Sequence, residues 1–254
     1  LVSTSSDFGL LGQDPSHPEL LDWLANEFMR GGWRLKELHR LLLSSAVYRT
    51  RSRPEGLDDQ SWRALVEADP GNRLLGRMHR RRLEGEALRD AMLAVSGRLN
   101  RRAGGPGVRP PLPPEVVKTL LKDQWPTTPD PEEHERRSIY LFVRRNLKYP
   151  LFEVFNRPDQ NLSCSRRQQT TIAPQALAML NSEFSQETVA HLARRIDLER
   201  FRDPAAQIDD LYRLLYGRPA VADEVAATVA WGDAAGAQGW HDLLPALLNA
   251  NEFI

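Results

Sequence analysis

The sequence is poor in cysteine, with Cys164 alone among 254 residues. One cysteine excludes an internal disulfide, a multi-cysteine metal site and the paired-cysteine motif of c-type haem attachment. It does not decide between a reducing and an oxidising compartment. The nearby Arg166 and Arg167 favour a lowered thiol pKa, as a nucleophile needs, but a lone cysteine is more often a small buried apolar residue.

Long hydrophobic runs are absent too, because no stretch of about 18 uncharged apolar residues occurs. We therefore expect no membrane span. The first residues, Leu1 to Ser6, lack both an initiator methionine and the basic-then-apolar order of a signal peptide. This leads us to expect either a fragment of a longer protein, lacking a short N-terminal part, or a processed product.

A net charge is also lacking, since 34 basic residues balance 34 acidic ones. The distribution is nevertheless uneven: residues 73–102 hold nine basic and three acidic residues, residues 136–167 hold eight and two, and residues 183–254 hold six and twelve. This asymmetry has two interpretations, an anion-facing patch or ion pairs between the central and C-terminal regions. With a balanced charge and no helix-turn-helix signature, nucleic acid is not an expected partner.

The chain is ordinary globular protein in composition, with 41% hydrophobic residues, and its apolar residues mostly recur at helical spacing. We predict a mainly α fold, a multi-helix globular domain with at most a short, minor β element. Glycine and proline mark the breaks, as at Gly31-Gly32 after a first helix and between Gly104 and Pro111. The predicted helices start after Pro18, near Leu35, near Leu74 (running to Val95) and at Pro174, and lie near 205–216, 221–231 and 240–250.

One segment has a composition typical of a strand rather than a helix, because residues 139–143, Ile-Tyr-Leu-Phe-Val, are mostly β-branched or aromatic. They predict a short strand, whose partner lies either near Val116-Val117 or before the first residue. The expected organisation is a single domain over 1–254. It comprises an N-terminal helical part (1–100), a Pro/Gly-rich excursion (101–137) and a part with the strand and the C-terminal helices (138–254).

The densest polar segment contains Arg82, Glu86 and Asp90 at helical spacing, with Arg89 beside them. If this face is buried, it is a paired ionic network. If it lines a cleft, Glu86 and Asp90 are the candidate catalytic acid and base, or the arginines grip an anion. The spacing alone leaves both interpretations open.

A second polar constellation runs from Arg144 through Asp159 to Asn181 and includes the predicted helix start at Pro174. Free amides at a helix start favour anions, so this region predicts a binding pocket. The candidate binding residues of the two constellations are Arg82, Arg89, Arg144, Arg166, Arg167 and Gln175. No metal site and no cofactor are expected, because no two of the six histidines share the spacing of a helical metal site.

Several phrases, in the same order along the chain, resemble the domain of unknown function 1553, the planctomycete-type C-terminal domain. They include His17-Pro18-Glu19-Leu20-Leu21-Asp22-Trp23-Leu24, Asn72-Arg73-Leu74-Leu75, Arg137-Ser138-Ile139-Tyr140-Leu141-Phe142, Thr170-Thr171 with Pro174-Gln175-Ala176-Leu177, and Leu248-Asn249-Ala250-Asn251-Glu252-Phe253. The resemblance implies an extracytoplasmic module of a large exported protein, beside a c-type cytochrome-like domain. It implies no catalytic residue.

The leading hypothesis is thus a non-catalytic interaction or scaffold module whose partners are neighbouring domains of its parent protein. The alternative is a hydrolase-like enzyme or binding domain for an anionic or carbohydrate ligand, using Glu86, Asp90, Arg144 and Arg167. Buried, fully paired carboxylates would favour the scaffold, and an open polar cleft would favour the enzyme.

Overall fold

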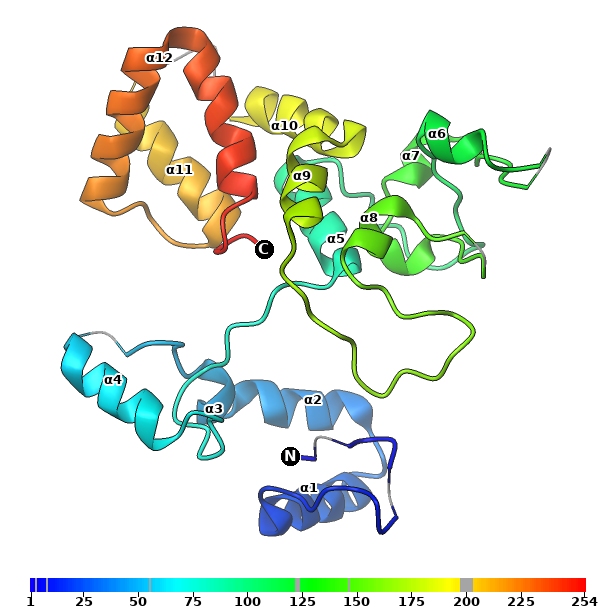
Figure 1. The fold of residues 1–254 in the computed structure, drawn as a ribbon, viewed down its shortest axis with the longest axis vertical. Helices are drawn as coiled ribbons and strands as arrows, with labels where there is room; N and C mark the ends of the chain where they lie inside the picture. The colour runs from blue at the N-terminus through cyan, green and yellow to red at the C-terminus, as the bar shows by residue number, and fades with distance from the viewer. Residues whose placement is uncertain (3, 8, 55, 122–123, 146, 197–202) are drawn as a thin grey trace. The chain divides into compact units, whose positions relative to one another are not determined.

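The computed structural model describes residues 1–2, 4–7, 9–54, 56–121, 124–145, 147–196 and 203–254, without the side chains of 233–238 and 240–241. The chain divides into two compact units, an N-terminal unit of Leu1–Arg81 and a C-terminal unit of Arg82–Ile254. Helices dominate both units (Figure 1), and the prediction of a mainly α protein is confirmed.

The N-terminal unit contains four helices: α1 (Pro18–Arg30), α2 (Leu35–Ser44), α3 (Ala46–Arg49) and α4 (Asp59–Ala68). Proline at its start favours α1, and Gly32 ends the turn after it with a φ of 71° that suits glycine. Side-chain caps start the later helices, since Ser45 accepts from the amide of Tyr48 and Asp58 from the first amides of α4. Helix α2 packs against α1 and α3.

This unit has almost no interior. None of its four helices has a buried residue, and among its described residues only Asn72 is buried. The large apolar side chains that stay exposed include Leu20, Trp23, Met29, Trp33, Leu35, Leu41, Leu42, Leu43, Val47, Tyr48 and Leu65. Because burial of apolar surface is the main force that stabilises a fold, these helices have little of their own to hold them.

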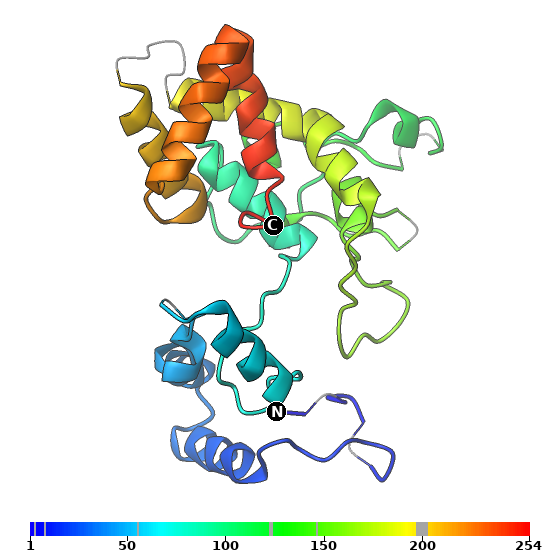
Figure 2. The same ribbon diagram turned by 60° about the vertical axis from the view of Figure 1, so that its left-hand side comes forward.

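The C-terminal unit contains the hydrophobic core. Helices α5 (Gly85–Val95), α8 (Pro150–Val154), α9 (Ala173–Asn181), α10 (Glu183–Arg195), α11 (Pro204–Tyr216) and α12 (Ala222–Leu248) surround it. Leu88, Phe152 and Leu192 are fully buried there, and each such side chain contributes about 1.5–3 kcal/mol by burial. Figures 1 and 2 show α5 beneath α9 and α10, with α11 and α12 beside them.

The described residues between 96 and 149 of the C-terminal unit form an irregular excursion with little regular structure. It includes the short helices α6 (Pro114–Val117) and α7 (Pro131–His134) and a 3-10 turn, η1 (Ser138–Tyr140). Isolated bridges join Asn100 to Arg136 and Val108 to Leu141. Among the described residues, no helix has the length and apolar content that crossing a bilayer requires.

Three local predictions are wrong. The helix expected from Leu74 begins only at Gly85, because the Asp69 carboxylate binds the amides of Arg73 and Leu74 and folds that segment into a loop. The strand expected at 139–143 is the η1 turn plus one bridge from Leu141 to Val108, not to Val116-Val117. The helices expected near 221–231 and 240–250 are one continuous element, α12, whose ribbon turns back on itself midway, so that its two halves run side by side (Figures 1 and 2).

Candidate functional site

The most concentrated polar chemistry lies where α5 begins, around the carboxylate of Glu86. Arg167 donates to it twice, with Nη1 2.7 Å from Oε2 and Nη2 3.2 Å from Oε1. Arg157 approaches the same group, its Nε lying 3.4 Å from Oε1, and Arg167 also pairs with Glu84 at 3.0 Å. The carboxylate is mostly buried, with 21% of its side chain exposed. We call Glu84, Glu86, Arg157 and Arg167 the Glu86 cluster.

Charge within this cluster keeps Glu86 ionised. Burial alone raises the pKa of the Glu86 carboxyl, but hydrogen bonds from Arg167 and the charges of Arg167 and Arg157 hold it below its ordinary value. The same bond raises the pKa of Arg167. A general acid needs a proton at working pH, so a lowered pKa does not suit Glu86 to that role. Both oxygens accept from Arg167, so the carboxylate is held in one orientation within the cluster.

Arg82 was expected on the helical face of Glu86 and Asp90, and this expectation is wrong because Arg82 precedes α5. Its Nη2 donates to Asn156 Oδ1 at 3.3 Å, and its guanidinium stacks 4.8 Å from the Phe155 ring centre. Burial lowers the pKa of Arg82. Among the described residues it has no carboxylate partner. Its role here is to join the start of α5 to the end of α8.

These contacts close a loop. Residues 156–170, which connect α8 to α9, form a long surface loop in Figure 1. At its base Asn156 accepts from the Thr170 hydroxyl at 2.8 Å, and Arg157 and Arg167 both reach Glu86. Arg157 and Arg167 of the second polar constellation thus meet Glu86 of the first. Their contacts with Glu86 anchor the 156–170 loop, whose two ends lie close to each other.

The other candidate carboxylate, Asp90, belongs to a separate cluster. It accepts from the amide of Ser138 at 2.7 Å and pairs with Arg137, with Arg89 at 3.9 Å. Arg89 itself is only 2% exposed and donates to the carbonyls of His134 and Arg136. These contacts fasten the excursion to α5. A guanidinium so enclosed has no surface left for a ligand.

The remaining candidates are scattered. Arg144 donates to the carbonyl of Gln124. Gln175 is buried, where it accepts from the amide of Ile172 and donates to the carbonyl of Val154. Arg166 and Cys164 lie exposed on the 156–170 loop, and the Cys164 thiol donates to the Arg166 carbonyl. The structure therefore brings Arg167 and Glu86 together, but not Arg144, Asp90 or Gln175 with them.

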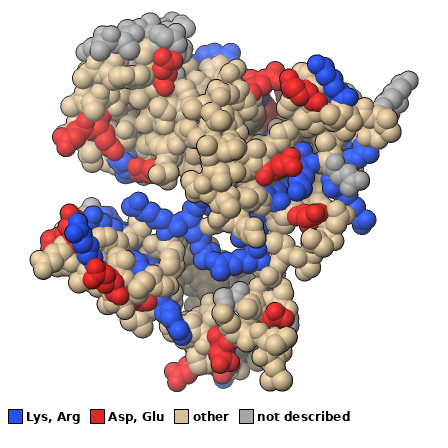
Figure 3. Space-filling model, viewed as in Figure 1, with Lys and Arg blue, Asp and Glu red and all other residues tan. Residues whose placement is uncertain are grey.

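Histidine and acidic residues do not converge either. Within the described part of the chain, no three His, Cys, Asp or Glu residues are placed to hold a metal ion. His134 bonds the Thr128 carbonyl, and His191 has its pKa lowered by burial and by nearby Arg98. His241 is outside the described side chains. On the face drawn in Figure 3, charges of both signs lie in small groups around a broad uncharged area over α9 and α10.

Sequence reasoning missed Arg157, Glu84 and Arg137 as partners of the two carboxylates. Arg157 stood in the second constellation, but no spacing rule connects it to Glu86, 71 positions earlier. Glu84 was visible only as a neighbour of the expected helical face. Ion pairs between distant segments depend on the packing of α5 against α8, which the local pattern does not encode.

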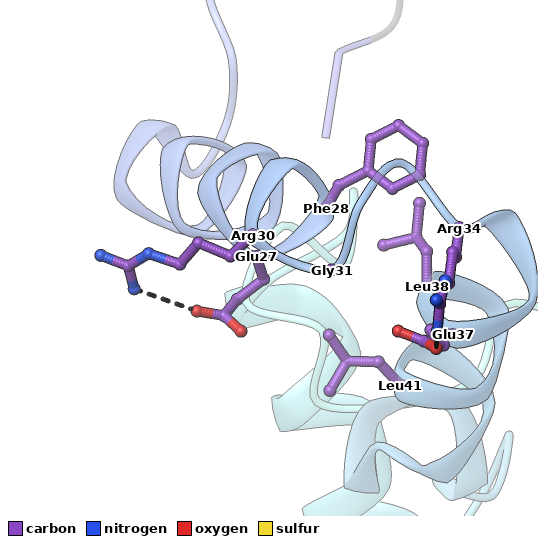
Figure 4. A pocket seen from close by; sticks show the side chains of 8 residues that line it. All are labelled: Glu27, Phe28, Arg30, Gly31, Arg34, Glu37, Leu38 and Leu41. Carbon is purple, nitrogen blue, oxygen red and sulfur yellow. Dashed lines mark hydrogen bonds and ion pairs between the residues drawn. The ribbon is translucent and has the colours of Figure 1, made fainter.

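Two hollows lie on α2 of the N-terminal unit. One of about 370 Å³ is lined by Phe28, Gly31, Leu38 and Leu41, with the ion pairs Glu27–Arg30 and Arg34–Glu37 at its rim. Figure 4 shows Leu38 and Leu41 reaching from α2 toward the end of α1. The other is a shallow, open depression on one side of α2 alone, lined by Lys36, His39, Arg40, Leu43 and Ser44. We call it the basic groove.

One family model matches residues 1–231, and its description is PSD1, protein of unknown function (DUF1553). No curated protein and no solved structure matches the chain.

Proposed function

The chain belongs to the PSD1 family of proteins of unknown function (DUF1553), and we propose that it is a non-catalytic interaction module of an exported multidomain protein. Its partners in this proposal are neighbouring domains of the parent protein, including a c-type cytochrome-like domain. The exported location and the cytochrome-like neighbour rest on the sequence resemblance. The absence of catalysis and the role in binding rest on the geometry.

The observation that carries the proposal is the state of Glu86 and Asp90. Each carboxylate is mostly buried, with 21% of its side chain exposed, and each is engaged by arginine. Catalytic carboxylates of glycosidases flank one scissile bond and differ in protonation at working pH. Glu86 and Asp90 instead fasten two different segments, the 156–170 loop and the excursion, onto α5.

The N-terminal unit supplies the argument for binding. Its helices have apolar faces without a buried residue, which is unusual for a unit of this length. Exposed apolar surface bordered by polar residues is typical of protein-binding sites. A partner that covers these helices would give them the burial that their own packing does not provide.

The hydrolase alternative makes a different prediction for the same residues. It requires Glu86, Asp90, Arg144 and Arg167 to face one substrate, whereas Arg144 donates to Gln124 and Asp90 lies against Ser138. This arrangement favours the interaction module. The two functions are separated by an assay of the purified chain with chromogenic glycosides, carboxylic esters and phosphate esters.

The interaction module predicts no turnover above the buffer rate, with or without Glu86. Turnover that is lost in Glu86→Gln or Asp90→Asn, in variants that still melt cooperatively, would overturn the proposal. A matched variant, Glu153→Gln on the exposed side of α8, controls for loss of a carboxylate as such.

A further inference from the structure

We propose that the basic groove on α2 is a docking site for an acidic amphipathic helix of a partner protein. The inference rests on the proposed interaction function and names the surface and the partner chemistry. It follows from the apolar pattern of α2, from the sign of the charges beside it and from the charges of α1.

The apolar residues of α2 divide between two neighbours. Leu38 and Leu41 line the hollow toward α1 (Figure 4), so they belong to the packing of the N-terminal unit. Leu35, Leu42 and Leu43 stay exposed by 61%, 42% and 50%. Because Leu35 and Leu42 are seven residues apart, they lie along one line of the helix. Leu43 lies about a quarter turn further round, on the face that carries Lys36, His39 and Arg40. This line is the kind of ridge that a second helix packs against.

The formally charged residues around Leu43, Lys36 and Arg40, have the same sign. Lys36, His39 and Arg40 are exposed and line the basic groove with Leu43. Within the described residues, neither Lys36 nor Arg40 forms an ion pair. The charges on the other side of α2 and at the end of α1 are already neutralised, by Arg34–Glu37 at 2.9 Å and Arg30–Glu27 at 3.4 Å. Lys36 and Arg40 of the basic groove therefore remain available to attract an acidic partner.

These features specify the occupant. An apolar ridge with cations along one edge complements a helix that presents leucine-like anchors at i, i+3, i+4 and i+7 with Asp or Glu beside them. A broad anionic surface such as a lipid bilayer fits less well. Helix α1, packed beside α2, carries Glu19, Asp22 and Glu27 against Arg30, and such a surface would meet these acids as well.

The test uses the full 254-residue chain and two labelled synthetic helices of equal length, one of leucine and glutamate and one of leucine and lysine at the polar positions. Fluorescence anisotropy at low salt is expected to show binding of the glutamate peptide only. The double variant Lys36→Glu, Arg40→Glu should weaken it by about tenfold or more, since two attractions become repulsions. Leu43→Gln should weaken it while keeping every charge.

The matched control is Arg63→Glu with Arg73→Glu, which reverses two exposed charges elsewhere in the same unit and should leave the affinity unchanged. Absence of binding, equal binding of the lysine peptide, or equal loss in the control pair would overturn the inference. So would binding to phosphatidylglycerol vesicles without binding to the glutamate peptide. None of these outcomes bears on the turnover assay, so failure here is distinguishable from failure of the proposed function.

Discussion

Arg167 grips Glu86 at two points, its Nη1 and Nη2 lying 2.7 and 3.2 Å from the two carboxylate oxygens. The two residues are 81 positions apart, so the pair fixes the start of α5 to the loop that leads into α9. Planar two-point pairing of this kind is stronger and more directional than a single contact. The pair thereby ties the C-terminal end of the 156–170 loop to α5.

Replacing Glu86 with Gln should lower the free energy of unfolding by about 2 kcal/mol. Loss of an exposed ion pair costs less than about 1 kcal/mol and loss of one partner of a buried pair costs about 3–5 kcal/mol, and this half-buried pair lies between them. The variant leaves Arg167 and Arg157 close together without the anion that neutralises them. Urea unfolding followed by circular dichroism measures the change. Glu153→Gln, the exposed control, should change the unfolding free energy by less than about 0.5 kcal/mol, and equal effects of the two variants would contradict the role of the pair.

Arg167→Lys keeps the positive charge but loses the planar fork, so it should destabilise by about 1 kcal/mol. Arg166→Lys provides a neighbour with an exposed side chain, for which no change is expected. Thermal melting of both variants tests the geometry rather than the charge. If Arg167→Lys has the same melting temperature as the wild type, the two-point pairing does not contribute to stability.

Acid should remove the contribution of Glu86. Its pKa in the folded chain lies below the ordinary 4.5, so the unfolded chain takes up the proton first as the pH falls. The stabilisation is complete above about pH 5 and disappears as the pH drops through the lowered folded pKa. Unfolding free energies of wild type and Glu86→Gln, measured from pH 7 to pH 2.5, should therefore converge in acid. Curves that stay parallel would show that ionised Glu86 does not stabilise the fold.

Gly85, the first residue of α5, should not tolerate a side chain. A Cβ there would lie 3.0 Å from Phe155 Cβ and 3.3 Å from the Phe152 backbone, both in the core. Gly85→Ala should therefore destabilise by about 1–3 kcal/mol through overpacking. Gly76→Ala, where a Cβ meets nothing within 4 Å, is the control. Equal melting temperatures for the two variants would mean that α8 shifts freely away from α5.

The sequence predicted the helix ends that proline and glycine determine locally. Pro18 and Gly31-Gly32 define α1 because proline favours a helix start and glycine a left-handed end. The helix predicted after Asn72 was wrong. Leu74, Leu75 and Met78 have helical spacing, but the Asp69 carboxylate and the Asn72 side chain form hydrogen bonds with the backbone of this segment. Leu75 even takes a φ of 56°. Side-chain bonds to the backbone override a weak apolar pattern.

The strand prediction at residues 139–143 was wrong for a related reason. Leu141 forms a bridge with Val108. Two residues after Val108 stands Pro110, which has no backbone N–H to donate, so the pairing does not extend into a β-ladder. The candidate site was predictable only in part. Glu86 and Arg167 stood out as charged residues, but their pairing depends on how α5 packs beside α8 and α9. Of the basic groove, the sequence predicted only the helix that starts near Leu35.

If the chain is an interaction module as proposed, its N-terminal unit depends on a partner for stability. Hydrogen exchange of the isolated 254-residue chain, followed by mass spectrometry, measures this dependence. Amides of α1 and α2 should exchange far faster than those of α5 and α10, whose faces lie in the core, and should slow when the glutamate peptide is added. Protection of α1 and α2 equal to that of α5, before any partner is added, would contradict the account.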